Sequence, residues 1–221
     1  MASFSRRIAF LFPSALLFGT AAFAQSPQRY EVTVTNLTRG QRFTPILVAS
    51  HRAGPTLFTE GSAATVPLEI LAEGGDTGPL AAFLTSDPLV RDVADSGRLL
   101  DPGASVTVSV EAGSGFDHVS VVSMLIPTND GFFALNGVPA PQGVAPLTLY
   151  SPAWDAGTES NDELCIHIPG PPCMGEGFSA SRAGAEGFVR IHEGIHGIGD
   201  AMPAVRDWRN PVAKIVIRPV R

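Results

Sequence analysis

Short stretches in which apolar and polar residues alternate recur along this chain, and they restrict its fold more than any other feature. Valines occupy every second position in part of residues 30–36 (YEVTVTN) and in residues 105–111 (SVTVSVE). This period of two predicts strands with one buried face. Residues 118–126 (HVSVVSMLI) are apolar at most positions, which predicts a central strand buried on both faces. Five further strands are expected at residues 44–50, 56–59, 147–150, 187–191 and 212–220.

Residues 77–95 are the one stretch that favours helix. Leu80 and Leu84 are one helical turn apart and predict a first short helix. A second short helix is expected to begin at Pro88, where the missing N–H costs nothing, and to end at Gly97. Its buried face would consist of Leu89, Val90 and Val93. We interpret the helical stretch as a crossover between two sheets, with a lid as the alternative. About eight strands and little helix indicate an all-β antiparallel sandwich.

Residues 1–24 have the pattern of a secretory signal peptide. Arg6 and Arg7 precede an apolar run at residues 8–18, and Ala22-Phe23-Ala24 matches a cleavage site. A membrane anchor is the alternative, but the apolar run is too short to span a bilayer. The sequence therefore predicts export to the periplasm or secretion.

Residues 25–221 have a length that suits a single all-β domain. Of the 15 basic residues, two lie in the predicted signal, so 13 remain against 21 acidic residues, a net charge of −8. Nucleic-acid binding needs clustered Lys and Arg, so this acidic balance argues against it. No segment after residue 24 is apolar over enough residues to predict a transmembrane helix.

The chain contains two cysteines, Cys165 and Cys173, within the segment CIHIPGPPC. In an oxidising compartment a pair this close favours a disulfide that closes a small loop. Two free thiols and a zinc-binding pair are the alternatives. The turn residues Gly170, Pro171 and Pro172 lie between the cysteines and favour the disulfide, because they fold the segment back on itself.

Two polar loops follow apolar strands. Residues 128–131 (TNDG) form a turn after the strand at 118–126, and residues 154–162 (WDAGTESND) form a loop after the strand at 147–150. Calcium takes six to eight oxygen ligands from flexible loops. The two loops therefore predict one shared calcium site. The alternative is a solvated acidic loop in which Asp130 forms an Asx turn.

Two long segments at these loops, SMLIPTNDGFFALNG (123–137) and YSPAWDAGTESND (150–162), are similar to the signatures of a known family. Further similar segments follow in the family's order along the chain: EVTVTNL, FTPILVASH, LFTEG, GFVRIHEGIHGIGD and DWRNPVAKIVIRP. The chain thus resembles the spondin N-terminal domain family, which implies a C2-like β-sandwich.

The resemblance also implies a set of metal ligands. The family's metal-binding aspartates correspond here to Asp130, Asp155 and Glu159. Glu159 is one methylene longer than the family's aspartate, and Gly131 stands where animal members have a tryptophan. The implied function is that of an exported, non-enzymatic, calcium-binding protein for cell adhesion or recognition at the cell surface or in the periplasm. Its partner would be a surface protein or a glycan, and the residues favour neither.

One motif points to a different class of protein. Residues 192–196 (HEGIH) match the H-E-x-x-H pattern of zinc hydrolases, in which a helix presents both histidines on one face. Gly194, Gly197 and Gly199 disfavour a helix here, so a strand that runs into a glycine-rich loop is the preferred interpretation. A zinc hydrolase and a metal-free structural sandwich remain the alternative functions. The two tryptophans, Trp154 and Trp208, either form a ligand platform or pack in the core.

Overall fold

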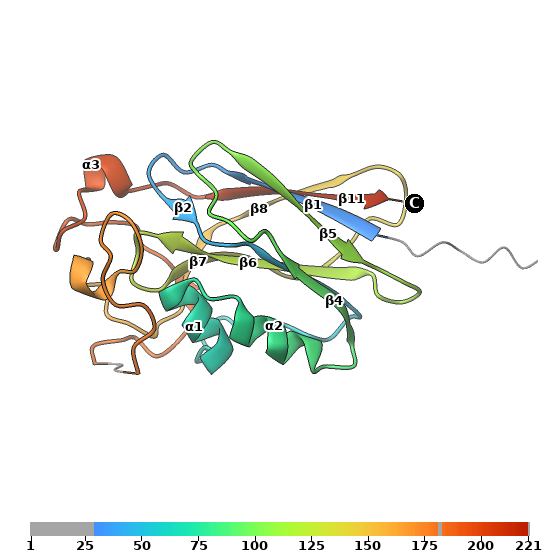
Figure 1. The fold of residues 1–221 in the computed structure, drawn as a ribbon, viewed down its shortest axis with the longest axis horizontal. Helices are drawn as coiled ribbons and strands as arrows, with labels where there is room; N and C mark the ends of the chain where they lie inside the picture. Colours follow the sequence, from blue (N-terminus) through green and yellow to red (C-terminus); the bar gives the residue numbers. More distant parts are fainter. Residues whose placement is uncertain (1–28, 181–182, 221) are drawn as a thin grey trace, which may run out of the picture.

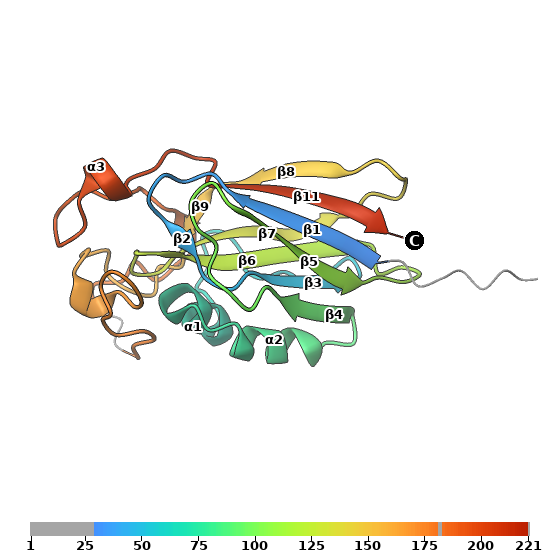
Figure 2. The same ribbon diagram turned by 45° about the horizontal axis from the view of Figure 1, so that its top comes forward.

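The structure, a computed structural model, describes residues 29–180 and 183–220, and they form two antiparallel sheets stacked on each other (Figures 1 and 2). The smaller sheet has the strand order β5-β1-β11-β8. The larger sheet has the order β10-β9-β7-β6-β3-β4, and β2 pairs with β6 beside it. The all-β sandwich predicted from the sequence is confirmed. The predicted signal peptide, residues 1–24, lies outside the described residues.

The strands of the smaller sheet are β1 (Arg29–Asn36), β5 (Ser105–Glu111), β8 (Leu147–Ser151) and β11 (Ala213–Val220). Those of the larger sheet are β2 (Arg42–Phe43), β3 (Leu47–His51), β4 (Val90–Asp95), β6 (His118–Ile126), β7 (Gly131–Pro139), β9 (Ala153–Asp155) and β10 (Arg190–Ile191). The helices are α1 (Val66–Gly74), α2 (Gly78–Thr85) and α3 (Pro203–Arg206), with a 3-10 turn at Cys165–His167. None of the helices in the described part of the chain has the length and apolar character that crossing a membrane requires.

The main core lies between the two sheets, and the period-two pattern explains it. Val32 of β1 is opposite Val108 of β5, and both side chains are buried against the larger sheet. Strand β6 pairs with β3 on one side and β7 on the other, so the prediction of a central strand is confirmed. Its second face is covered by the helices: Val122 belongs to a further apolar cluster that includes Leu68 of α1 and Leu80 of α2.

The helices differ from the expectation in three ways. Helices α1 and α3 lie outside residues 77–95, the one stretch that was expected to favour helix. The first predicted helix is present as α2, but the second is wrong, because residues 90–95 form strand β4 instead. Val90 and Val93 are β-branched, and the open edge of β3 offers this segment backbone hydrogen bonds along its length. Helices α1 and α2 connect β3 to β4, which are neighbours in one sheet. These two helices therefore cover the outer face of that sheet and do not cross between the sheets (Figure 2).

Two further strand expectations need correction. Residues 56–59 form no strand, and the strand expected at 187–191 is limited to β10 at Arg190–Ile191. Strands β2, β7 and β9 were not predicted from the sequence. The loops that follow β9 gather at the end of the sandwich opposite the end of β11 (Figure 1). The predicted site residues lie at that loop-bearing end.

Candidate functional site

The two predicted acidic loops meet at one end of the larger sheet. Asp130 ends the turn between β6 and β7, and Asp155 is the last residue of β9. Strands β7 and β9 are paired with Gly131 opposite Asp155, and the N–H of Ala156 donates to the carbonyl oxygen of Asp130 at 3.2 Å. Pairing of these two strands therefore places the two aspartates side by side.

The carboxylate of Asp130 is fully buried and joins the two loops. Its Oδ2 accepts hydrogen bonds from the N–H of Thr158 at 2.7 Å and of Glu159 at 3.1 Å, and from Thr158 Oγ1 at 3.3 Å. Its Oδ1 is buried and has no hydrogen-bond partner among the described residues. Burial raises the pKa of Asp130 to about 8, and the nearby Asp155 carboxylate adds to this shift.

The carboxylate of Asp155 has a complete set of protein partners. Its Oδ1 accepts from the N–H of Gly157 at 2.8 Å, and its Oδ2 accepts from Asn161 Nδ2 at 2.6 Å. Arg190 Nη2 lies 3.2 Å from the same Oδ2. Burial raises the pKa of Asp155, while Asn161 and Arg190 oppose that shift. The guanidinium of Arg190, which the sequence analysis did not single out, thus compensates this buried charge.

Glu159, like Asp130 and unlike Asp155, has a buried carboxylate oxygen without a hydrogen-bond partner among the described residues. Its side chain is buried, and its Oε2 has no hydrogen-bond partner in the described part of the chain. Burial raises the pKa of Glu159 to about 8, and the carboxylates of Glu73 and Asp130 raise it further. Two of the three predicted ligands therefore keep a buried carboxylate oxygen without a donor.

The unpartnered oxygens of Asp130 and Glu159 have the chemistry of calcium ligands, but they do not form a complete metal site. Within residues 29–180 and 183–220, no group of three or more His, Cys, Asp or Glu side chains is arranged to hold a metal ion. Asp130 Oδ1 and Glu159 Oε2 nevertheless have the chemistry that calcium prefers, and buried carboxylates without donors are costly unless a cation or proton neutralises them. Asp155 does not share this need, because its oxygens are already satisfied.

The HEGIH segment is an irregular loop after β10, as the sequence analysis preferred. Gly194 has a φ of 101°, which no helix contains. His192 Nδ1 accepts a hydrogen bond from the N–H of Gly194 at 3.0 Å, and burial lowers the pKa of His192 to about 3. The neutral ring therefore carries its proton on Nε2. A zinc-bound histidine has the reverse arrangement, since its second nitrogen donates to an acceptor.

Glu163 holds this loop in place, and the sequence analysis missed it. Its carboxylate accepts hydrogen bonds from three consecutive backbone N–H groups, those of His196 at 2.5 Å, Gly197 at 2.7 Å and Ile198 at 3.1 Å. Consecutive N–H groups of this kind form an anion-binding concavity. The only sequence signal was an acidic residue beyond the loop at 154–162, which resembles many solvated carboxylates.

Cys165 and Cys173 form a disulfide with an S–S distance of 2.02 Å, as predicted. The bridge closes the loop that carries Gly170, and a Cβ at Gly170 would lie 3.4 Å from Ile126 at the end of β6, next to the first acidic turn. His167, inside the bridged segment, places Nδ1 at 2.6 Å from Asp162 Oδ2. The disulfide thus restrains the chain that follows the second acidic loop.

Comparison with models of known protein families gives a match over most of the chain. The family model described as Spondin_N matches residues 24–164, which is more than half of the chain and includes Asp130, Asp155 and Glu159. No curated protein matches the chain. The matched range covers β1 to β9 and both loops that meet at the acidic end of the sandwich. The chain therefore belongs to the spondin N-terminal domain family.

Proposed function

We propose that this chain is an exported, non-enzymatic recognition protein whose acidic loops bind calcium. One observation carries the calcium part. Asp130 and Glu159 come from different loops, and each has a buried carboxylate oxygen without a hydrogen-bond donor among the described residues. Bound calcium would supply positive charge that offsets the repulsion between these carboxylates.

Asp130 and Glu159 are the proposed ligands, and Asp155 has a supporting role. Asp155 Oδ2 already faces Arg190 at 3.2 Å and Asn161 at 2.6 Å, so it orders the second loop without a metal. Calcium requires six to eight oxygens, and two carboxylates leave the others to water and main-chain carbonyls. A site with so few charged ligands belongs to the weak class, with a Kd on the order of 10⁻⁴ to 10⁻³ M.

Export and recognition are supported by the family and by the disulfide. Disulfides persist in oxidising compartments outside the cytosol, and the Cys165–Cys173 bridge suits the periplasm or the cell exterior. The spondin N-terminal domain is an extracellular domain, in agreement with the predicted signal at residues 1–24. We therefore place the protein at the cell surface or in the periplasm, with adhesion or recognition as its role.

The zinc hydrolase is the rival function, and the structure favours it less. Its pattern requires His192 and His196 on one helical face, whereas the two residues lie in a loop and His192 Nδ1 accepts a backbone N–H at 3.0 Å. Glu193, the expected general base, lies 3.3 Å from Arg190 Nη1. Zinc that remains bound to the purified protein, together with hydrolytic activity lost in Glu193→Gln, would establish the enzyme instead.

Thermal unfolding with and without calcium tests the proposal. Calcium should raise the melting temperature of the wild-type protein, and EDTA should reverse the rise, because a ligand that binds only the folded state stabilises it. Glu159→Gln should lose most of this response. Glu60→Gln, which changes an exposed carboxylate, is the matched control and should respond as the wild type does. A wild-type melting temperature that ignores both calcium and EDTA would remove the calcium part of the proposal.

A further inference from the structure

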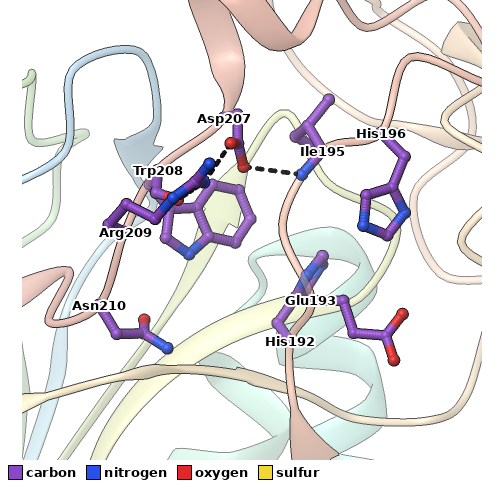
Figure 3. Close-up of a pocket in the computed structure, with 8 residues that line it drawn as sticks. All are labelled: His192, Glu193, Ile195, His196, Asp207, Trp208, Arg209 and Asn210. Atoms are coloured by element: carbon purple, nitrogen blue, oxygen red, sulfur yellow. Dashed lines mark hydrogen bonds and ion pairs between the residues drawn. The ribbon is translucent and has the colours of Figure 1, made fainter.

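A pocket with a volume of about 320 Å³ lies between the loop after β10 and the segment before β11 (Figure 3). His192, Glu193 and His196 line it from the loop. Trp208 and Asn210 line it from the other side. Neither Asp130 nor Glu159 lines this pocket, although His192 also lies against the turn at Gly131.

His192 lines the pocket and carries a buried hydrogen-bond donor. Its side chain is 5% exposed, and its Nε2 has no hydrogen-bond partner among the described residues. Because Nδ1 accepts from the N–H of Gly194, Nε2 carries the proton of the neutral ring. A buried N–H without an acceptor is costly, and such groups in folded proteins call for an explanation such as a ligand or an ordered water.

The rest of the pocket lining presents both donors and acceptors, among them the acids Glu193 and Asp207. The Glu193 carboxylate lies 3.3 Å from Arg190 Nη1. Asp207 is paired with Arg209 and accepts from a backbone N–H (Figure 3). Arg190 also pairs with Asp155 and Glu186, whereas Arg209 pairs with Asp207. The oxygens of Glu193 and Asp207 remain able to accept further hydrogen bonds.

Asn210 and Trp208 add an amide donor and an aromatic surface to the pocket. Asn210 Oδ1 accepts from the N–H of Ala153 at 2.9 Å, so the amide nitrogen of Asn210 remains as a donor. The indole of Trp208 supplies an apolar wall, and its ring centroid lies 4.9 Å from that of His192 in an edge-to-face arrangement. The pocket thus combines paired charges, amide and imidazole donors and an aromatic surface.

We propose that this pocket binds a neutral sugar unit. A sugar hydroxyl oxygen would accept from His192 Nε2, other hydroxyls would donate to Glu193 and Asp207, and the apolar C–H groups would contact Trp208. An anionic ligand suits the pocket less, because Asp130 and Asp155 are buried nearby and the protein has an excess of acidic residues. The inference rests on the proposed recognition function and names its ligand class as carbohydrate.

The pocket also shares a wall with the acidic loops. A Cβ at Gly131 would lie 2.9 Å from His192 Cδ2, so the imidazole packs directly on the turn that contains Asp130. The absence of a side chain at position 131 makes room for this ring. Calcium at the acidic loops should therefore order the turn on which His192 rests and strengthen sugar binding without contacting the sugar.

The test is calorimetric titration of the purified protein with four neutral probes, the methyl glycosides of glucose, galactose, mannose and N-acetylglucosamine, and with glucuronate as an anionic probe. At least one neutral glycoside should bind. His192→Phe should weaken that binding about tenfold or more, whereas His192→Gln, which keeps a donor, should retain part of it. His167→Gln alters a histidine outside the pocket and should leave binding unchanged.

Each other outcome overturns the inference or one of its parts. Absence of binding to all four glycosides, or binding that His192→Phe leaves unchanged, overturns the sugar site. Stronger binding of glucuronate overturns the choice of a neutral ligand. The titrations are run in calcium and in EDTA, which separates this inference from the calcium proposal. Sugar binding without calcium binding removes only the metal, and calcium binding without sugar binding removes only the pocket.

Discussion

Asp130 Oδ2 accepts a hydrogen bond from the backbone N–H of Thr158 at 2.7 Å, although the two residues are 28 positions apart in the chain. The bond is buried, and it ties the turn before β7 to the loop after β9. It also determines which oxygen of Asp130 is left over, because Oδ1 has no hydrogen-bond partner in the described part of the chain. The contact that joins the loops is thus what leaves one carboxylate oxygen available for a cation.

Stability without calcium should fall as the pH rises from 6.5 to 8.5. The folded-state pKa values of Asp130 and Glu159 are about 8, whereas both groups titrate near pH 4 when unfolded. In this pH range the folded state binds more protons than the unfolded state, so raising the pH favours unfolding. Thermal unfolding in EDTA across this range measures the slope, which should be smaller in Glu159→Gln.

The pH window lies mostly above the range in which His192 contributes to the pH dependence. Its pKa is lowered to about 3 in the folded state, so its contribution is lost as the pH falls below its unfolded value of about 6.5. That loss has the opposite sign and lies at lower pH. A melting temperature that is constant or rising between pH 6.5 and 8.5 in EDTA would contradict the account of the two buried carboxylates.

Gly131→Ala should destabilise the protein by about 1 to 3 kcal/mol, because overpacking a filled site forces its neighbours to move. A Cβ at this position would lie 2.7 Å from Thr128 Oγ1 and 2.9 Å from His192 Cδ2. Gly143→Ala is the matched control, since a Cβ there has no neighbour within 4 Å. Urea denaturation of both variants measures the difference, and equal stability of the two would show that the turn and His192 are not in contact.

Arg190→Gln should cost about 3 kcal/mol or more, because it leaves a fully buried carboxylate without its cation. Arg190 Nη2 lies 3.2 Å from Asp155 Oδ2, and the Asp155 side chain is 0% exposed. Arg209→Gln removes an arginine whose side chain is 85% exposed, and it should cost less than about 1 kcal/mol. Chemical denaturation of the two variants provides the comparison. Similar losses would mean that Arg190 does not compensate Asp155.

Glu163→Gln should loosen the loop after β10 without unfolding the sandwich. The substitution weakens the acceptor of three backbone N–H groups, those of residues 196–198, at a cost of about 1 to 3 kcal/mol. Hydrogen exchange of these amides should accelerate, while exchange in β6 should not change. Glu176→Gln, a change in a neighbouring loop, is the control. Unchanged protection at residues 196–198 would show that Glu163 is not the anchor of this loop.

The sequence predicted the fold correctly where a residue pattern is compatible with only one type of secondary structure. The alternation in residues 30–36 and 105–111 fits a half-buried strand alone, and β1 and β5 have these positions. The segment that became β4 fits a short helix and an edge strand equally well. Pairing with β3 decides between them, and no local pattern reports that pairing.

In the candidate site, too, some features could be predicted from the sequence and others depend on tertiary contacts. Asp130 and Asp155 could be predicted to meet because each follows an apolar strand and because the family resemblance covers both. Arg190 could not, since it reaches Asp155 only through the pairing of β10 with β9, in which the two residues are direct partners. The tautomer of His192 could not be predicted either, because it depends on a hydrogen bond from the N–H of Gly194 in an irregular loop.

Calorimetric titration of the purified protein with calcium tests the central claim most directly. The account predicts one site with a Kd on the order of 10⁻⁴ to 10⁻³ M, and binding that is lost in Asp130→Asn and retained in Glu60→Gln. The absence of binding by the wild-type protein up to about ten times the upper end of that range, or equal binding by Asp130→Asn, would contradict it.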